Sequence, residues 1–464
     1  MRVLQVSNFA EPLGGAEVHM HQVIEALGAR GHRVALFAGS EQTEEHTELR
    51  RVVKRPAWSP ADLIHDPKLL TAFESFLEEF KPELIHLHNA SHLPISLITT
   101  LGSHAAPVLM TVHDASVVCA NAWLVWGDGT PCPGGVGAKC LSNGCEKNYP
   151  FDARVLVASR LRTEALQSNV DAFASPSRFL LERISEDGFE NVHHLPYWIE
   201  KSPRPEGIER DHDQVLFLGR LAREKGLDVL LRAWARVQQA RPQARLTIVG
   251  SGPEEQDLRS LAAELGLDVE AIFVGRVPHD QVAEVQARAA IQVIPSIWGE
   301  NSPVSIYESY LAGLPMVASS IGGIPEMVRE GETGLLARPR DPEHLAQRLV
   351  ELLSDRELQK RLAAGCLASV EQFTPEVHMD QLLPLYEGLL RNGQVDTARR
   401  PPIAADHIQL QDAIFRQLHE TESWAQDMLG HIKNLEGDLP PGTPIKNFAR
   451  HVKHLVKRRL PRAR

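Results

Sequence analysis

Residues 295–328 read PSIWGENSPVSIYESYLAGLPMVASSIGGIPEMV, and this stretch decides how the 464-residue chain is interpreted. It begins as the end of an apolar strand, turns, and continues as a helix for which Ser302 fits the N-cap and Pro303 the first helical position. Glu300 falls in the turn, and Glu308 lies about a turn and a half into the helix. A strand, a turn and a helix in this order indicate a parallel α/β domain.

The same alternation of short apolar runs and amphipathic stretches occurs on both sides of a linker at Pro196–Asp213, which is rich in proline and charge. It predicts two doubly wound parallel sheets. Because ligands bind at the carboxyl ends of parallel strands, two such domains predict a cleft between them. We expect strands at Val3–Ser7, Arg33–Ala38, Leu84–His88, Val108–Val112, Asp171–Ser175, Gln214–Gly219, Arg245–Gly250, Ala271–Gly275, Ile291–Pro295 and Pro315–Ala318.

The composition narrows the class of function. Hydrophobic residues make up 43% and charged residues 23% of the chain, values typical of a soluble globular protein. The net charge of −11 argues against nucleic acid as a partner, since binding to phosphate backbones needs clustered cations. No apolar run reaches the ~18 residues of a membrane span, and the N-terminus lacks the pattern of a signal peptide. We therefore expect a cytoplasmic protein.

The two glutamates and the start of the helix suit a ligand with hydroxyl groups at both ends and a diphosphate between them. Carboxylates such as Glu300 and Glu308 accept hydrogen bonds from sugar and ribose hydroxyls. The N–H groups of Val304 and Ser305 at a helix N-terminus can receive the diphosphate. Downstream, Gly323 lies in a tight turn that allows close approach by a ligand.

Two cations, Arg220 and Lys225, follow the first strand of the second half in FLGRLAREKGLDVLL. There they can neutralise a diphosphate leaving group. Together these residues resemble retaining glycosyltransferase family 4, and the resemblance covers roughly residues 1–392. It implies a GT-B fold and a nucleotide-sugar donor, with Glu300 contacting the donor sugar, Glu308 the ribose, and Arg220 and Lys225 the diphosphate. No Asp-x-Asp motif is apparent near the site, so we expect no catalytic cofactor and cation neutralisation in place of Mg²⁺.

The resemblance also implies a function for each domain. We expect an N-terminal, acceptor-side Rossmann-like domain at residues 1–200, with a cysteine-rich insertion at 115–150. A nucleotide-sugar-binding Rossmann-like domain follows at 201–375. A closing helix at 376–395 is expected to return to the first domain, and residues 396–464 form a helical tail.

In the first half, Gly14 and Gly15 follow the first strand and open a helix at Glu17–Ala29, with Val18 and Leu27 on its apolar face. An isolated glycine pair is explained as well by a strand-to-helix turn. In the family, however, a glycine-rich loop at this place approaches the donor diphosphate and sugar. The resemblance therefore implies the same for Gly14 and Gly15.

Histidines follow or lie within two strands of the first half. His113 and Asp114 come at the end of a strand, and the resemblance implies that His113 contacts the donor sugar and belongs to the catalytic residues. His86 and His88 alternate along a strand and so share one face. The sequence leaves two alternatives for this pair, which either lines the acceptor cleft or packs inside the domain.

Four cysteines, Cys119, Cys132, Cys140 and Cys145, fall in a glycine- and proline-rich stretch with little periodicity. Four thiolates around Zn²⁺ could stabilise such a segment, although no spacing is the tight Cys-x-x-Cys of common zinc ribbons. Free thiols and disulfides are the alternatives. Cys366 lies in a helix and is expected in the core.

The end of the chain differs from the rest. A long helical stretch at Ala404–Leu435 is a candidate for self-association. From Lys446 to Arg464 there are eight Lys or Arg residues and no acidic one. Thr443 and Pro444 can start a helix with one apolar and one basic face, the pattern of a helix that lies on an anionic membrane. Docking on the protein's own surface is the alternative.

Three functions compete. The first is a retaining glycosyltransferase with a glycan or lipid-linked acceptor, in surface polysaccharide or glycolipid synthesis. The second is a sugar-nucleotide epimerase or a phosphorylase on the same architecture. The third is a non-catalytic sugar-binding scaffold with 404–435 as its partner helix.

Overall fold

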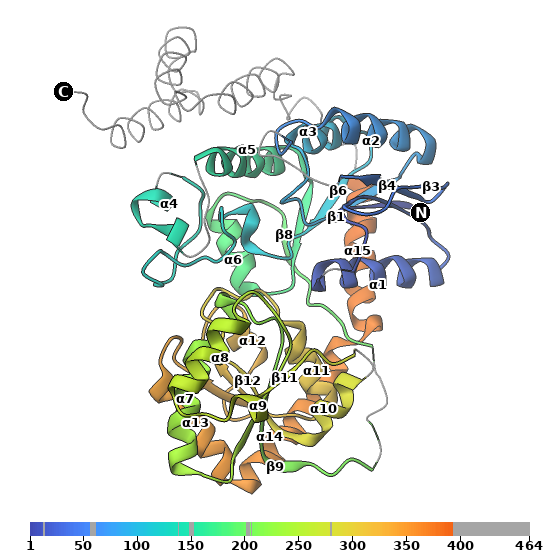
Figure 1. Cartoon of the computed structure of the whole chain (residues 1–464). Helices are drawn as coiled ribbons and strands as arrows, with labels where there is room; N and C mark the ends of the chain where they lie inside the picture. The colour runs from blue at the N-terminus through green and yellow to red at the C-terminus, as the bar shows by residue number, and fades with distance from the viewer. Residues whose placement is uncertain are drawn as a thin grey trace, which may run out of the picture.

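The computed structural model describes residues 1–392 except 13, 56–61, 138, 148–152, 201–204, 206 and 279–280. The expected helix at 404–435 and the basic segment at 443–464 lie outside the described residues. The described part forms two α/β domains, one above the other in Figure 1. The predicted fold class is therefore confirmed.

The N-terminal domain is built on an eight-stranded sheet in the order β3-β4-β2-β1-β5-β6-β7-β8. All neighbouring strands are parallel except β3 and β4. Strand β5 is buried at every position, as expected where helices cover both faces of a parallel sheet. The strands are β1 Arg2–Phe9, β2 Arg33–Ser40, β3 Glu45–His46, β4 Arg50–Lys54, β5 Leu84–His88, β6 Val108–Thr111, β7 Ala172–Ser175 and β8 Val192–His194.

The C-terminal domain has a six-stranded parallel sheet in the order β11-β10-β9-β12-β13-β14. The order reverses between β9 and β12, which is the topological switch point where open α/β sheets bind ligands. The strands are β9 Asp211–Leu218, β10 Arg245–Val249, β11 Phe273–Gly275, β12 Ala289–Ile294, β13 Met316–Ser319 and β14 Gly334–Ala337.

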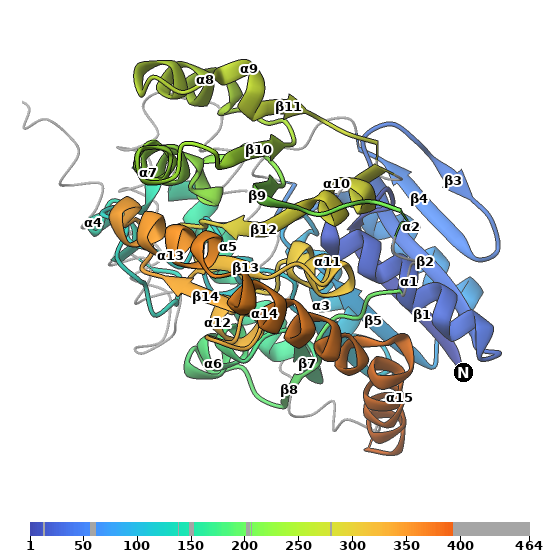
Figure 2. The same cartoon turned by 90° about the horizontal axis from the view of Figure 1, so that it is seen from below.

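Helices pack on both faces of each sheet (Figures 1 and 2). In the first domain α2, α3 and α5 share one hydrophobic core with the strands, and α1 and α15 share another. The helices of the first domain are α1 Gly15–Ala29, α2 Pro67–Phe80, α3 Ile95–Ser103, α4 Lys139–Ser142, α5 Ala153–Asn169 and α6 Arg178–Glu186. Those that follow are α7 Leu227–Ala240, α8 Glu255–Glu264, α9 Val269–Ile272, α10 Val282–Arg288, α11 Val304–Ala312, α12 Ile324–Met327, α13 Pro342–Ser354, α14 Arg356–Ser369 and α15 Pro375–Asn392.

Helix α15 belongs to the C-terminal part of the sequence but packs on the N-terminal sheet (Figure 1). Met379 and Leu382 are fully buried in the core that also contains Val3. The hydroxyl of Tyr386 lies 2.6 Å from Nδ1 of His86 in β5. The chain therefore crosses between the domains twice, once after β8 and once before α15.

The fold departs from the predictions in a few elements. Strands β3, β4, β8 and β14 were not predicted, and β11 begins only at Phe273 because the preceding residues form α9. On α1, Val18 is 42% exposed and does not face the core as expected, whereas Met20 is fully buried. Cys366 lies in α14 and is fully buried, as predicted.

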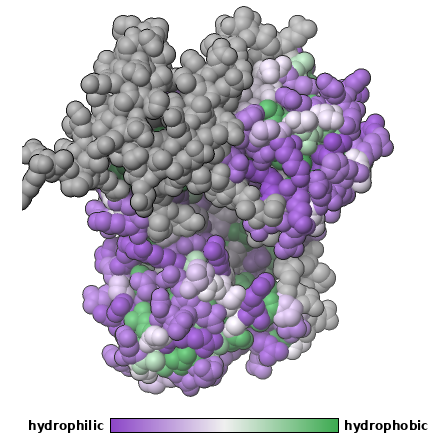
Figure 3. All heavy atoms as spheres, turned by 45° about the horizontal axis from the view of Figure 1, so that its top comes forward, coloured by the Kyte–Doolittle hydropathy of each residue, from purple (hydrophilic) through white to green (hydrophobic). Residues whose placement is uncertain are grey.

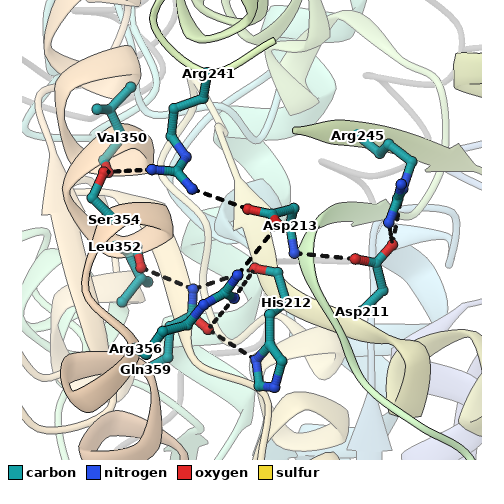
Figure 4. Close-up of polar contacts among 10 residues, drawn as sticks. All are labelled: Asp211, His212, Asp213, Arg241, Arg245, Val350, Leu352, Ser354, Arg356 and Gln359. Atoms are coloured by element: carbon teal, nitrogen blue, oxygen red, sulfur yellow. Dashed lines mark hydrogen bonds and ion pairs between the residues drawn. The ribbon is translucent and has the colours of Figure 1, made fainter. Parts of the chain in front are cut away.

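An ion-pair network fixes the amino end of β9 (Figure 4). Asp213 accepts from Arg241 at 3.1 Å and from Arg356 at 3.2 Å, and Asp211 pairs with Arg245. These arginines come from the end of α7, the start of α14 and the start of β10. The network lies at the opposite end of the sheet from the loops that follow the strands. We therefore infer that it stabilises the fold and does not bind a ligand.

The face shown in Figure 3 is mostly hydrophilic on both domains, with scattered hydrophobic residues. Among the described residues, every helix is too short or too polar to pass through a lipid bilayer.

Candidate active site

The loop for which the sequence predicts donor binding, residues 295–303 and called the donor loop below, connects β12 to α11 at the carboxyl edge of the C-terminal sheet. Helix α11 begins at Val304 with Pro303 at the N-cap, so the predicted cap at Ser302 is wrong by one residue. Ser302 is buried, and its hydroxyl lies 2.8 Å from that of Tyr307. Because proline offers no side-chain acceptor, the first N–H groups of α11, those of Val304 and Ser305, are available to an anionic ligand.

Glu300 is only 5% exposed although it lies in a loop. Its Oε1 accepts hydrogen bonds from Nζ of Lys225 at 2.6 Å and from Oγ of Ser296 at 2.8 Å. The Lys225 ammonium also lies 5.3 Å from the centre of the Trp298 ring, within range of a cation–π contact. The structure thus brings two of the predicted catalytic residues together and fixes both charges by a short, charge-assisted contact.

Lys225 is placed there by the segment that follows β9. Gly226 has a φ of 68°, and a Cβ at this position would lie 2.2 Å from the carbonyl oxygen of Pro295. Glycine therefore allows the turn to approach the donor loop closely. Arg220 lies in the same segment and its side chain is exposed, so it can swing towards a ligand at this edge.

A cavity of about 460 Å³ lies between α1 of the first domain and α10 and α11 of the second. Its lining includes Gly15, Val304 and Glu308, three of the predicted donor-binding residues, together with Tyr197 and Trp198. A Cβ at Gly15 would lie 3.1 Å from Cγ2 of Val304, so the two helix N-termini approach each other closely. Gly14 is the N-cap of α1 beside this contact.

Gly322 and Gly323 allow a close approach, but the partner is the donor loop itself. A Cβ at Gly322 would lie 2.3 Å, and one at Gly323 2.0 Å, from the carbonyl oxygens of Glu300 and Asn301 respectively. The N–H of Gly323 donates to the Glu300 carbonyl at 2.7 Å. The glycine turn therefore supports the backbone that carries Glu300.

His113 follows β6 and is 9% exposed. Its Nδ1 lies 2.6 Å from the hydroxyl of Tyr197, and its Nε2 lies 3.0 Å from Nδ1 of His88. Nε2 of His88 lies 2.7 Å from Oε1 of Gln5. Burial lowers the pKa of His113 to about 3, so its ring is neutral at neutral pH. Both ring nitrogens are engaged within the protein, and the contact of His113 with the donor sugar stays a prediction.

His86 is fully buried between Tyr386 and Thr111, whose hydroxyls lie 2.6 and 2.7 Å from its two ring nitrogens. The rings of His86 and His88 are 4.1 Å apart, so the two share a face as expected. Both are packed inside the domain and do not line the cleft. Asp114 caps the short helix after β6 by accepting from the N–H of Ser116 at 2.8 Å.

Sequence reasoning missed an interdomain clasp formed by Asn301. The amide nitrogen of Asn301 donates to the carbonyl oxygens of Val112 and His113 at 3.1 and 2.9 Å. Its amide oxygen accepts from Oγ of Ser177 at 2.5 Å. Beside it, the Glu326 carboxylate accepts from the first two N–H groups of α6, at 2.7 and 2.6 Å. The residue after Glu300 therefore joins the donor loop to the N-terminal domain.

The cysteine-rich segment also contacts the donor loop. The N–H of Gly299 donates to the carbonyl of Trp123 at 2.9 Å, and the rings of Trp123 and Trp298 are 6.4 Å apart. Arg223 donates to the carbonyl of Lys147 at 2.8 Å. This insertion thus borders the site from the side of the N-terminal domain.

The four thiols of that segment, Cys119, Cys132, Cys140 and Cys145, are free, buried and line one small cavity of about 10 Å³. Burial raises the pKa of each thiol, to about 11 for Cys119 and about 12 for Cys145. As the side chains stand, no group of three or more His, Cys, Asp or Glu residues in the described part of the chain is arranged to hold a metal ion.

Two doubly wound domains that meet across a cleft, with a donor loop at the switch point of the second, define the GT-B class of glycosyltransferases. Comparison with models of protein families identifies the family within this class. Residues 13–202 match the model described as Glycosyltransferase Family 4, and residues 199–365 match that described as Glycosyl transferases group 1. The chain belongs to glycosyltransferase family 4 and is a glycosyltransferase enzyme.

Relatives of known function match most of the chain. It is 29% identical over 412 residues to a D-inositol 3-phosphate glycosyltransferase of Acidothermus cellulolyticus, covering 83% of this chain and 88% of the relative. It is 28% identical over 386 residues to a phosphatidyl-myo-inositol mannosyltransferase of Mycobacterium leprae, covering 82% and 94%.

A solved structure shares the fold. The crystal structure of Anabaena HepE in complex with UDP-glucose superposes with a TM-score of 0.61 at 17% identity, covering 84% of this chain and all of that one. Glycosyltransferases of family 4 use nucleotide-sugar donors as substrates.

Proposed function

We propose that this enzyme transfers a sugar, with retention of anomeric configuration, from a nucleotide sugar to a glycan or lipid-linked acceptor in surface polysaccharide or glycolipid synthesis. The observation that carries the proposal is the contact between Glu300 and Lys225 next to the unblocked N-terminus of α11. The names of the relatives, which include a phosphatidyl-myo-inositol mannosyltransferase, support an acceptor of this class.

In this proposal each charged residue acts on one part of the donor. Arg220 and Lys225, with the N–H groups at the start of α11, stabilise the charge that develops on the leaving diphosphate. Glu300 holds the donor sugar. No side chain is assigned as a covalent nucleophile, because Oε1 of Glu300 is already engaged by Lys225 and Ser296. The departing diphosphate then takes the proton of the acceptor hydroxyl as that oxygen attacks from the same face.

Glu308 binds the nucleotide ribose in this proposal, since it lies on the wall of the interdomain cavity. The test is a thermal-shift panel of UDP-, GDP- and ADP-sugars, followed by calorimetry with the best nucleotide. Glu308→Ala should weaken nucleotide binding by about 1.5–3 kcal/mol, the scale of hydrogen bonds to a charged group. Glu264→Ala, an exposed glutamate at the end of α8, is the matched control. Equal nucleotide affinity in the two variants would refute the role of Glu308.

Analysis of the products formed from the same nucleotide sugars, with and without an acceptor, separates the competing functions. A non-catalytic scaffold would bind no nucleotide sugar, or would bind one without turnover. An epimerase would convert the donor without an acceptor. Release of nucleoside diphosphate that depends on an added acceptor is the result expected of a transferase.

A structural zinc site remains part of the proposal. Its support is the burial of four thiols, Cys119, Cys132, Cys140 and Cys145, around one cavity. Binding would require the side chains to turn towards that cavity, since they are not arranged as a metal site in the structure. Four thiolates would then cross-link a segment that has few regular elements.

Membrane attachment through Thr443–Arg464 and self-association through Ala404–Leu435 are further proposals. Both segments lie outside the described residues and rest on the sequence alone. Attachment to the cytoplasmic face of an anionic membrane would place the cleft beside a lipid-linked acceptor.

A further inference from the structure

Tyr197 lies where the N-terminal domain passes into the linker, and its hydroxyl contacts the imidazole of His113. The hydroxyl oxygen is 2.6 Å from Nδ1 of His113. The two rings are nearly parallel, with their centres 5.7 Å apart and an angle of 24° between their planes. Tyr197 is 7% exposed and lines the cavity between the domains. Its side chain thus connects the wall of that cavity to His113.

The contact between Tyr197 and His113 is the first of three hydrogen bonds in a row. Nε2 of His113 lies 3.0 Å from Nδ1 of His88, and Nε2 of His88 lies 2.7 Å from Oε1 of Gln5. Burial lowers the pKa of His88 well below its usual range and that of His113 to about 3, so each ring is neutral and carries one N–H proton.

These protons fix the direction of the row. Because the amide oxygen of Gln5 can only accept, Nε2 of His88 donates to it. Nδ1 of His88 therefore accepts from Nε2 of His113. Nδ1 of His113 in turn has no proton and accepts from the hydroxyl of Tyr197. The structure thus assigns His113 to the tautomer that has its proton on Nε2.

The backbone on both sides of Tyr197 is fixed by elements from the end of the described chain. The carbonyl of Pro196 lies 2.7 Å from Nδ1 of His378 in α15. The N–H of Ile199 donates to the carbonyl of Phe373 at 2.9 Å. The place of the Tyr197 hydroxyl is therefore set by its surroundings, and the hydroxyl can serve as a fixed reference for the group that it contacts.

His113 is held at its backbone as well as at its ring. The amide nitrogen of Asn301 in the donor loop donates to the carbonyl of His113 at 2.9 Å. The ring cannot turn without losing its hydrogen bonds to Tyr197 and His88. Hydrogen bonds that lock the side chain of a functional residue are the usual means of holding it in a productive geometry.

We propose that Tyr197 is a positioning residue for glycosyl transfer, and that its hydroxyl holds the ring of His113 in one orientation and one tautomer. The inference rests on the proposed glycosyltransferase function and adds a residue of the interdomain linker to it. Because Tyr197 acts through His113, its hydroxyl should matter for turnover only while His113 is present. A contact that merely supported the fold would act in the same way with or without His113.

The test is a double-mutant cycle on the release of nucleoside diphosphate from the nucleotide sugar that the thermal-shift panel selects. Tyr197→Phe keeps the ring and removes the hydroxyl, and it should lower kcat at least about tenfold, whereas nucleoside diphosphate affinity should change less than about twofold. In the background of His113→Ala the same change should lower kcat less than about twofold. An equal fall in both backgrounds, or no fall in the first, would overturn the proposal.

Tyr386→Phe is the matched control. Tyr386 is buried in α15 against the same sheet, and its hydroxyl also lies 2.6 Å from a histidine nitrogen, Nδ1 of His86. Both variants lose one buried hydrogen bond between tyrosine and histidine, so both should lower the melting temperature by a similar amount. Only Tyr197→Phe should lower kcat. If kcat falls equally in the two variants, the loss follows stability and the inference is wrong.

A second measurement does not depend on turnover. Nitrogen NMR of protein labelled at histidine should show the proton of His113 on Nε2, and the Nδ1 resonance should move in Tyr197→Phe because its hydrogen bond is lost. A proton on Nδ1 in the parent protein would overturn the inference, since Tyr197 could not donate to it. Turnover by the parent protein with an unchanged kcat in Tyr197→Phe would refute this inference alone. Absence of nucleoside diphosphate release from every nucleotide sugar would refute the proposed function.

Discussion

Replacing Asn301 by alanine should uncouple the two domains without damaging the nucleotide site. The side chain makes three hydrogen bonds across the cleft, two to the carbonyls of Val112 and His113 and one from Ser177. At about 0.5–1.5 kcal/mol each, they contribute about 1.5–4.5 kcal/mol to the closed arrangement. Since about 1.4 kcal/mol is a factor of ten, the ratio of closed to open molecules should fall at least about tenfold.

The assay compares catalytic efficiency with nucleotide affinity. For Asn301→Ala, kcat/KM for transfer should fall about tenfold or more, because the acceptor-side and donor-side groups meet only in the closed form. Nucleotide affinity should change less than about threefold, because Glu308, Arg220 and Lys225 all belong to the second domain. Asn143→Ala removes a comparable amide whose hydrogen bond, to the carbonyl of Lys139, is local and exposed, and it should leave both quantities unchanged. A kcat/KM within twofold of the parent, or an equal loss in nucleotide affinity, would show that the clasp does not control closure.

Further predictions concern charge, pH, metal and membrane. Arg220→Ala and Lys225→Ala should each lower turnover by about 10²-fold through lost stabilisation of the leaving group, and full activity in either variant removes that residue from the site. Burial lowers the pKa of His19, His86, His88, His113 and His378, to about 4 for His378. The stability they provide is therefore complete above pH ~6.5 and is lost as the pH falls towards 4, by about 1.4 kcal/mol per pH unit for each histidine. In urea titrations His378→Gln should make the fall shallower by that amount, and parallel curves would contradict the reasoning. Protein purified without chelator should contain about one zinc per chain, and Cys140→Ser should lose it while retaining nucleotide binding; elemental analysis without any metal leaves the thiols free or oxidised. Deletion of Thr443–Arg464 should abolish salt-sensitive sedimentation with anionic liposomes, and negligible binding by both full-length and truncated proteins would exclude the attachment.

The positions of the main strands along the sequence could be predicted because a parallel sheet covered on both faces needs continuous apolar runs. β5, with the sequence LIHLH, was predicted at its observed bounds. The unpredicted strands are short or lie at the edges, and β4 reads RRVVK with two arginines. Such segments become strands only through the partner beside them, and that partner cannot be read from local sequence.

At the site, local pattern identified the charged residues but not their partners. Glu300 and Lys225 contact each other although they lie far apart in the sequence. The resemblance to the family predicted both residues at the donor site, but it did not predict their contact. Asn301 carried no signal, because an asparagine in a loop is common and its partners belong to the other domain. The engagement of both nitrogens of His113 was equally invisible, since it depends on Tyr197 beyond the end of the first sheet.

Helix α15 has a consequence for how the protein is made. Met379, Leu382 and Tyr386 complete a core whose other members include Val3 and Leu84, near the beginning of the chain. During translation the first domain therefore has to wait, with one apolar face of its sheet uncovered, until nearly four hundred residues have been synthesised. Because its core cannot be completed before the second domain has been synthesised, the first domain is prone to aggregation during most of translation. A nascent chain truncated before Pro375 should accordingly engage chaperones far more strongly than one that extends past Asn392.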